Sequence, residues 1–417
     1  MSKFFDVPTR RVVMATMTLG TDLPANATKR VDMSNFDAWR SPVLGMKPML
    51  LAIEARITGV FTTAAASAGL RDMFLQYLHD FVSLKGPGGI ELIRDGAGWH
   101  RYLFNYLQKG ELRGIRARAL AANAGPGTAS YTRTIEQFVD FVEHKAPDPY
   151  FRCWPFECFA NKASGAELTV RLRDSATLFL SAAAVVLGLS SATIEYAVHL
   201  SDVPAANLQI PAIVLESNIG HENRVRATPG NGAYLRCVVA NSPAPADNVG
   251  GEDDDLSGYD TIDSFGHEGR YLLKDESVDT FVQRVTDEVS DEPASNFDDP
   301  SNYRAAYRMT SPFENFDGHL RMLPLIYLRN GQGLGDVPVF QDEPKLRVNG
   351  DVRTALPEEI SWLTQQVIPR TKEQEKAILR SIRINGTDTP ISKAGVTPKR
   401  YAGHDPSRVP LIVDARS

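Results

Sequence analysis

Cysteine is scarce in this chain, with only three among 417 residues: Cys153, Cys158 and Cys237. So small and odd a number excludes a disulfide framework. Cys153 and Cys158 have no second cysteine pair near them, which argues against a structural zinc site. We therefore expect all three cysteines to be small core residues of a protein in a reducing compartment.

The chain also lacks a large excess of one charge and a long apolar run. It has 45 basic and 51 acidic residues, a net charge of -6, so a general attraction to nucleic acid is not expected. Its best apolar stretch, Leu178–Leu189, is about half as long as a bilayer requires. Residues 1–25 show no signal-peptide pattern. We expect a soluble product made in the cytoplasm.

Motifs that carry common catalytic chemistry are missing as well. The sequence contains neither of the two common glycine-rich phosphate loops and no GxSxG elbow. Its eight histidines form no HExxH motif or close pair, and Trp99-His100-Arg101 offers a single histidine, which we interpret as an ordinary strand residue. We accordingly predict no catalytic residue, no cofactor-binding residue, no metal ligand and no cofactor.

Two features allow a binding role as an alternative. The acidic run from Glu252 to Asp263 has the carboxylates that calcium prefers, but it lacks EF-hand spacing and is expected to be a solvated loop. The tryptophans Trp99, Trp154 and Trp362 are candidate sugar-stacking platforms, although such residues are more often core or interface anchors.

The sequence is instead rich in strand patterns. Apolar and polar residues alternate in several segments, which indicates half-buried strands. These segments are Leu51–Thr58, Ala166–Leu172 and Thr193–Leu200, with further strands expected at Tyr131–Glu143 and Leu323–Leu328. Clusters of glycine, proline and asparagine separate them, as at Lys85–Gly89, and Thr371–Ile384 is expected to be an amphipathic helix.

Short segments recur along the chain in the same order. Pro155–Phe159 returns at Pro312–Phe316, and Arg101-Tyr102-Leu103 returns at Arg270-Tyr271-Leu272. The strand around Ile53 has a counterpart around Ile213, and the strand beginning at Ile194 has one beginning at Ile360. The four offsets lie between 157 and 169 residues, which indicates a tandem duplication.

This repeat defines the expected organisation of the chain. We predict an all-β protein of two tandem β-sandwiches with short helices and extended terminal arms. The first sandwich is placed at residues 46–204, and the second at residues 205–370 with a long insertion at about 241–302. Residues 1–45 are expected to form an N-terminal arm, and residues 371–417 a C-terminal helix and arm.

The order of segments in the first half resembles a known family. Leu23–Asp32 is a polar lead-in, the apolar strand Met49–Thr63 follows, and Gly89–Ile93 and Gly98–Phe104 close the series. Together with the PFExF pair, this order resembles the double jelly-roll major capsid proteins of tailless icosahedral viruses. The tectivirus type is the nearest analogue, and adenovirus hexon is a distant one. The resemblance implies two eight-stranded jelly rolls.

The resemblance also implies a function. Such a protein self-assembles as pseudo-hexagonal trimers into an icosahedral virion shell, around an internal membrane, and is not an enzyme. Its partners would be its own copies, minor capsid and vertex proteins and membrane lipids, with no sequence-specific nucleic acid. It would be made in the host cytoplasm. Two alternatives remain open: a minor capsid or vertex protein of a similar virus, and a carbohydrate-binding β-sandwich protein.

Overall fold

A computed structural model describes the strands of both halves of the chain and the segments that connect several of them. The described residues are 9–19, 22, 26–34, 40–62, 78–96, 98, 100–101, 128–142, 150–160, 165–172, 193–205, 208, 210–220, 225–227, 232–243, 261–267, 270–277, 280, 321–327, 339–340, 345–349, 358–368 and 370–383.

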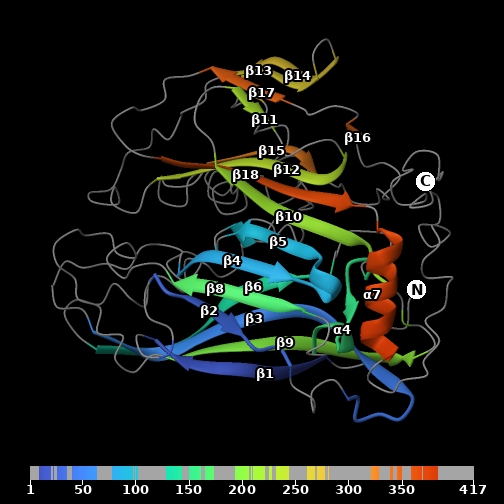
Figure 1. Cartoon of the computed structure of the whole chain (residues 1–417). Helices are drawn as coiled ribbons and strands as arrows, with labels where there is room; N and C mark the ends of the chain where they lie inside the picture. The colour runs from blue at the N-terminus through green and yellow to red at the C-terminus, as the bar shows by residue number, and fades with distance from the viewer. Residues whose placement is uncertain are drawn as a thin grey trace, which may run out of the picture.

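The first half folds into a sandwich of two four-stranded sheets (Figure 1). One sheet has the order β1-β9-β3-β6, and the other has the order β2-β8-β4-β5. Counted in chain order without the two-residue strand β7, these are strands 1-8-3-6 and 2-7-4-5, the order of an eight-stranded jelly roll. The bounds are β1 Thr9–Thr18, β2 Thr28–Val31, β3 Met46–Thr62, β4 His79–Lys85, β5 Glu91–Gly96, β6 Thr128–Asp140, β7 Trp154–Pro155, β8 Glu167–Leu172 and β9 Thr193–Pro204.

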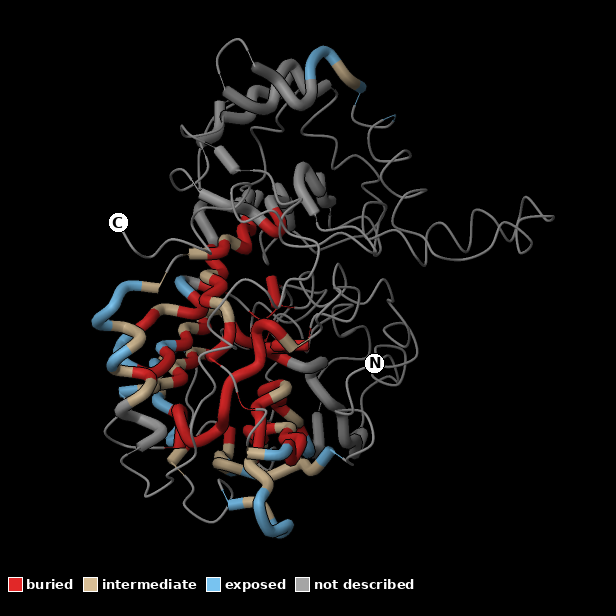
Figure 2. The backbone as a smooth tube through the Cα atoms, turned by 90° about the vertical axis from the view of Figure 1, so that its right-hand side faces the viewer, coloured by how far each residue is buried: buried red, intermediate tan, exposed pale blue. Residues whose placement is uncertain are grey.

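The alternating residues of these strands build the core of the first sandwich. On β3, Ile53, Ala55 and Ile57 are buried, as the sequence pattern predicts. On β8, Leu168, Val170 and Leu172 are also buried. Figure 2 shows buried residues filling this sandwich. Cys153, Cys158 and Trp154 are also buried, which confirms the interpretation of these residues as core residues.

The structure differs from the prediction at the N-terminus. Residues 1–45 were expected to be an arm, but they contain β1 and β2, the first two strands of the jelly roll. β1 pairs with β9 from Thr9↔Ser201 to Thr18↔Thr193, and β2 pairs with β8. Without them, each sheet would lose its edge strand. The sandwich therefore begins near residue 9 and not at residue 46.

The second half repeats the same topology. One sheet has the order β10-β18-β12-β15 and the other β11-β17-β13-β14, again strands 1-8-3-6 and 2-7-4-5. In each half a two-residue strand follows strand six and pairs with strand three: β7 with β3, and β16 with β12. The bounds are β10 Ile213–Gly220, β11 Val225–Ala227, β12 Gly232–Pro243, β13 Thr261–His267, β14 Arg270–Ser277, β15 Arg321–Tyr327, β16 Val339–Phe340, β17 Lys345–Asn349 and β18 Glu358–Ile368.

This shared topology supports the duplication but corrects its alignment. The segments at Ile194 and Ile360 lie in β9 and β18, the eighth strand of each half. Ile53 lies in a third strand, however, whereas Ile213 begins a first strand. Arg101 has helical backbone, whereas Arg270 begins β14. Two of the four matches are therefore not equivalent, and residues 312–316 lie outside the described residues. The expected insertion at 241–302 is also wrong in part, because it contains β13 and β14.

Short helices connect the layers. The 3-10 turn η2 covers Pro87–Gly89 and the helix α4 covers Glu157–Ala160. The helix α7, Lys372–Arg383, confirms the helix predicted at Thr371–Ile384. In the described part of the chain, no helix is long and apolar enough to cross a membrane. The stretch Leu178–Leu189 lies outside the described residues.

Candidate functional site

The two jelly rolls join through a pair of parallel strands. β5 is the last strand of its sheet in the first sandwich, and β10 is the first strand of the second sandwich. They pair at Glu216↔Ile93 and Ser217↔Arg94. One sheet thus runs without interruption from β15 in the second sandwich to β2 in the first (Figure 1). This pairing covers an edge of each sandwich and fixes the orientation of one against the other.

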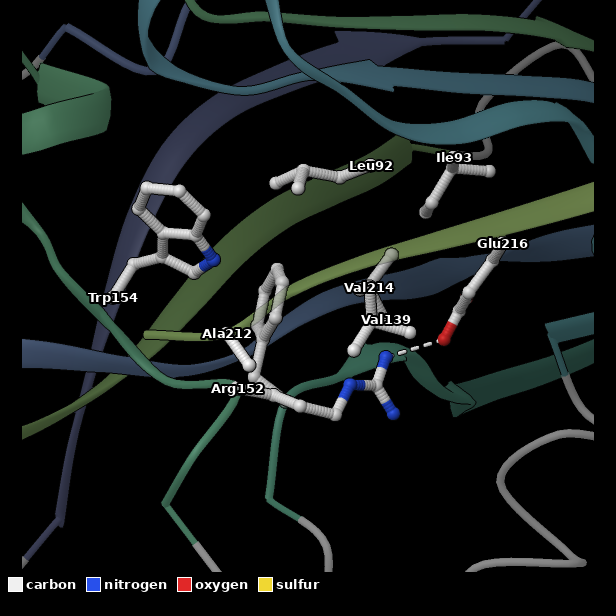
Figure 3. Close-up of a pocket in the computed structure, with 9 residues that line it drawn as sticks. Leu92, Ile93, Val139, Arg152, Trp154, Ala212, Val214 and Glu216 are labelled. Carbon is white, nitrogen blue, oxygen red and sulfur yellow. Dashed lines mark hydrogen bonds and ion pairs between the residues drawn. The ribbon is translucent and has the colours of Figure 1, made fainter. Parts of the chain in front are cut away.

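A buried carboxylate lies at this junction. The Glu216 side chain on β10 forms ion pairs with Arg101 and with Arg152, both of which belong to the first sandwich. Figure 3 shows the Arg152 guanidinium directed at the carboxylate. From the second sandwich, Gln365 Nε2 on β18 donates a hydrogen bond of 2.6 Å to Glu216 Oε1. Glu216 is only 4% exposed, so these partners replace the water that a free carboxylate would bind.

Further polar residues extend this network into the second sandwich. Arg236 on β12 donates a hydrogen bond to Gln365 Oε1. Beside Glu216, Ser217 Oγ lies 2.6 Å from Thr364 Oγ1 on the neighbouring strand β18. All of these side chains are buried. Strands one, three and eight of the second sandwich are therefore connected by side-chain hydrogen bonds as well as by their backbone ladder.

Burial changes the pKa of Arg101 at the junction. Removal from water, together with the positive charge of Arg152, lowers the pKa of Arg101 to about 9. The guanidinium nevertheless stays protonated at neutral pH. Arg101 and Arg152 thus both pair with the Glu216 carboxylate, and the loss of that carboxylate would remove an anion that offsets the repulsion between the two like charges.

Apolar side chains close the space around the ion pairs. The lining residues are Leu92, Ile93, Val139, Phe141, Trp154, Ala212 and Val214 (Figure 3). The space left between these side chains is only about 10 Å³. A buried water requires roughly 10–15 Å³, so this space is too small for a substrate or an organic cofactor. The ion pairs and the apolar side chains around them fix one sandwich against the other.

The C-terminal helix adds a second connection between the sandwiches. After β18, Arg370 Nη1 donates hydrogen bonds to the backbone oxygens of Ile210 at 3.1 Å and Pro211 at 2.8 Å, in the segment that links the two sandwiches. α7 then packs against η2 and α4 of the first sandwich, and Ile378 is fully buried. A Cβ atom on Gly88 would lie 2.8 Å from the Ala377 Cβ, so the fit is close.

A second charged cluster lies on the outer face of the sheet β1-β9-β3. Glu54 Oε1 is 3.2 Å from Arg11 Nε and 3.3 Å from Arg56 Nε, and Glu54 Oε2 bonds to His199. Burial raises the pKa of the Glu54 carboxyl, but the hydrogen bond and charge of His199 and the two arginines outweigh it and lower the pKa below the usual value. This cluster holds the outer faces of three neighbouring strands together.

Those residues considered from sequence that the structure describes do not converge on one place. His100 is buried, as an ordinary histidine would be, but it has helical backbone and does not lie in a strand. The acidic run Glu252–Asp263 lies outside the described residues up to position 260, and its end begins β13. Within the described ranges, no group of three or more histidine, cysteine or acidic residues has a geometry that holds a metal.

Sequence reasoning missed the junction. Glu216 stands in the segment Ile210–Ser217, which is otherwise strongly apolar, and an acidic residue in such a strand is a signal of a buried partner. Its partners Arg101, Arg152 and Gln365 are 115, 64 and 149 residues away in the chain. No local pattern connects them.

Comparison with known proteins gives no match to a protein-family model and no match to a curated protein sequence. Among solved structures, the chain is similar to the capsid of PBCV-1 virus, with 10% identity, a TM-score of 0.47, and 92% of this chain and 88% of that chain covered. It is also similar to a chain of Sulfolobus turreted icosahedral virus, with 12% identity, a TM-score of 0.42, and coverage of 90% and 98%.

The major capsid protein of bacteriophage PM2 is a further similar structure, with 10% identity, a TM-score of 0.40, and coverage of 87% and 99%. The likeness to these proteins is one of fold. The double jelly roll itself is established by the strand order of the two sandwiches, which is the same in both halves of this chain.

Proposed function

We propose that this chain is a major capsid protein, a structural and non-catalytic component of an icosahedral virion shell. One observation carries the proposal: two jelly rolls of the same strand order are fused by a continuous sheet into a single double unit. Jelly rolls are a common fold of viral capsid domains. A buried ion-pair network and a packed helix at the junction suit a capsid subunit whose two sandwiches must keep a fixed arrangement.

The double unit favours assembly in threes. Three chains related by a three-fold axis place six similar sandwiches in a ring, and such a ring approximates a hexagon. Hexagonal tiles cover a flat facet with few different contacts. In this proposal the chain forms homotrimers, packs against neighbouring trimers, and meets minor capsid and vertex proteins at special positions. An internal membrane beneath the shell belongs to the same proposal, as does synthesis in the host cytoplasm.

The mass of the protein in solution tests this assembly. Native mass spectrometry at micromolar concentration should give a species of three times 45.9 kDa, because obligate contacts of this kind bury more than about 2,000 Å². Electron microscopy of concentrated or co-expressed material should show faceted shells. A stable monomer under these conditions would contradict the proposal. A minor or vertex protein is distinguished by copy number, because it would be rare in purified particles.

One feature favours the carbohydrate-binding alternative. A trough of about 290 Å³ lies on the outer face of strands β2, β4 and β8. Its lining combines hydroxyl groups, charged groups and one aromatic ring, and consists of Thr28, Phe81, Ser83, Lys85, Glu167, Thr169 and Arg171. A monomeric protein that binds glycans, and loses this binding in the variant Thr169→Val, would favour the alternative over the capsid proposal.

A further inference from the structure

The connection between β2 and β3 carries an apolar tip. Pro42, Val43, Leu44 and Gly45 are four consecutive exposed residues. Leu44 is fully exposed and Val43 is 47% exposed. Figure 1 draws this segment as the blue loop at the lower right. Polar residues normally occupy such turns, so two adjacent exposed aliphatic side chains make this tip a candidate for a contact.

The apolar tip is held rigidly. The Met46 N–H donates to the Val43 carbonyl at 3.2 Å, and the Val43 N–H donates to Ser41 Oγ at 3.0 Å. Gly45 has a φ of 76°, a conformation that glycine adopts without strain, and its carbonyl accepts a bond of 3.1 Å from the Ala205 N–H. β3 begins directly after the tip. A backbone that is already ordered before binding loses little conformational freedom on contact, which favours a specific partner.

The size of the tip limits what it can do. Two aliphatic side chains can bury only a small part of the about 1,000 Å² or more that a stable interface requires. The tip therefore cannot hold two molecules together by itself. It contributes only where many equivalent contacts act together, as between the copies of a lattice.

The charges around the tip favour a protein partner over a bilayer. Loops that bind membranes combine apolar residues with lysine and arginine that remain available for lipid headgroups. Here Lys47 forms an ion pair with the buried Glu157, and Arg10 forms one of 3.2 Å with Asp202. These cations are already neutralised within the fold. The surroundings of the tip suit an apolar depression on another protein surface.

We infer that the tip at Pro42–Gly45 is a contact between copies of this chain, used between neighbouring trimers and not within one trimer. The inference rests on the proposed function. In the assembled shell, Leu44 and Val43 insert into the surface of an adjacent trimer. The same contact is too small to join isolated trimers at low concentration.

The test compares Leu44→Ser with the matched control Val13→Ser, which removes a side chain that is 37% exposed on β1. Native mass spectrometry measures the trimer, and light scattering measures the protein concentration at which shells form. We expect both variants to remain trimeric. Leu44→Ser should raise the assembly concentration at least about tenfold, which corresponds to the loss of a single apolar contact, and Val13→Ser should leave it near that of the parent protein.

Several outcomes would overturn the inference: unchanged assembly of Leu44→Ser, an equal defect in both variants, or dissociation of the Leu44→Ser trimer. Flotation with phosphatidylethanolamine and phosphatidylglycerol vesicles that depends on Leu44 would assign the tip to a bilayer instead. A photo-crosslinking residue at position 44 should join two copies of the chain in concentrated protein. If the parent protein is monomeric, the proposed function fails; if it assembles but position 44 yields no intermolecular product, only this inference fails.

Discussion

Two places where the described part of the molecule buries polar side chains, the interior of the first sandwich and the junction, are built in opposite ways. Inside the first sandwich, His79 Nε2 lies 2.8 Å from the Tyr196 hydroxyl, and Phe138 packs against both rings. Burial lowers the pKa of His79 to about 3, so this pair is neutral at physiological pH. At the junction, in contrast, Glu216, Arg101 and Arg152 are buried as ions.

The difference reflects what each site must specify. A sandwich interior needs only close packing, and a neutral hydrogen-bonded pair fits there at little cost. Two domains that meet edge to edge need a defined register and angle. Ions that are satisfied in a single arrangement penalise every other arrangement, since an unpaired buried charge is strongly unfavourable. The interior is thus built for stability and the junction for a fixed geometry.

The largest expected effect comes from removing the carboxylate at the junction. Glu216→Gln keeps the shape of the side chain but removes the buried negative charge that Arg101 and Arg152 both contact. We expect the free energy of unfolding to fall by about 3–5 kcal/mol, measured by urea denaturation. Glu195→Gln is the control, because the Glu195 side chain is 33% exposed and pairs only with Arg11 in the described contacts. It should cost about 1 kcal/mol or less.

A triple change would sharpen this contrast. Replacing Glu216 by Leu together with Arg101 and Arg152 by Met removes every charge of the triad, and such replacements are often close to neutral for stability. We expect the triple variant to be more stable than Glu216→Gln but to assemble less well, because the angle between the sandwiches is no longer specified. Normal assembly of the triple variant would show that the charges have no role in fixing the junction.

The interior pair predicts a dependence on acid. His79 has a pKa of about 3 in the fold and about 6.5 when unfolded, so the unfolded chain binds a proton that the fold excludes. Its stabilising contribution is complete above pH 6.5 and is lost as the pH falls from 6.5 towards 3, by about 1.4 kcal/mol per pH unit. In the double variant His79→Leu, Tyr196→Phe, the free energy of unfolding should no longer fall with this slope between pH 6 and 4. Tyr196→Phe alone should not.

The contrast between the two sites also explains which parts of the molecule were predictable. The strands at 51–58, 166–172 and 193–200 alternate between a buried and a polar face, so a local pattern reveals them. β1 has exposed or half-buried residues on both faces, because it is an edge strand, and it was predicted to be an arm. β13 and β14 follow an acidic segment, and their region was therefore interpreted as an insertion. The strand around Ile53 was matched to the wrong strand, the one around Ile213, because every half-buried strand has the same alternation.

The junction was beyond local reasoning for a different reason. The partners of Glu216 come from segments that are far apart in the chain and meet only in the folded protein, and no spacing in the sequence indicates that they do.

That the protein is not catalytic remains a prediction. The role of residues 386–417 also remains a prediction, because those residues lie outside the described part of the chain. We expect their deletion to leave trimers intact but to impair assembly.

A smaller effect is expected where α7 packs on the first sandwich. Gly88 has a φ of 72°, and an added Cβ would approach the Ala377 Cβ to 2.8 Å. We expect Gly88→Ala to lower the free energy of unfolding by about 1–2 kcal/mol from backbone strain alone, and by more from the clash. Ala377→Gly in the same chain should recover only the part due to the clash, which denaturation of the single and double variants would separate.

The smallest effect is expected at the beginning of α7. The Thr371 Oγ1 accepts a bond of 3.2 Å from the Gln374 N–H, and Gln374 Oε1 accepts one of 2.8 Å from the Thr371 N–H, a reciprocal capping box. Thr371→Ala removes one of these bonds and should cost about 1 kcal/mol. Thr371→Ser keeps the hydroxyl and is the control.

The consequence of this small change depends on whether α7 holds the two sandwiches together. If it does, hydrogen exchange should increase in Thr371→Ala not only in α7 but also in the strand pair β5–β10, because the helix connects the same two bodies. If exchange increases in α7 alone, the ion pairs of Glu216 maintain the junction without the helix. That result would assign the fixed geometry of the double unit to the buried charges and leave α7 as a cover for η2 and α4.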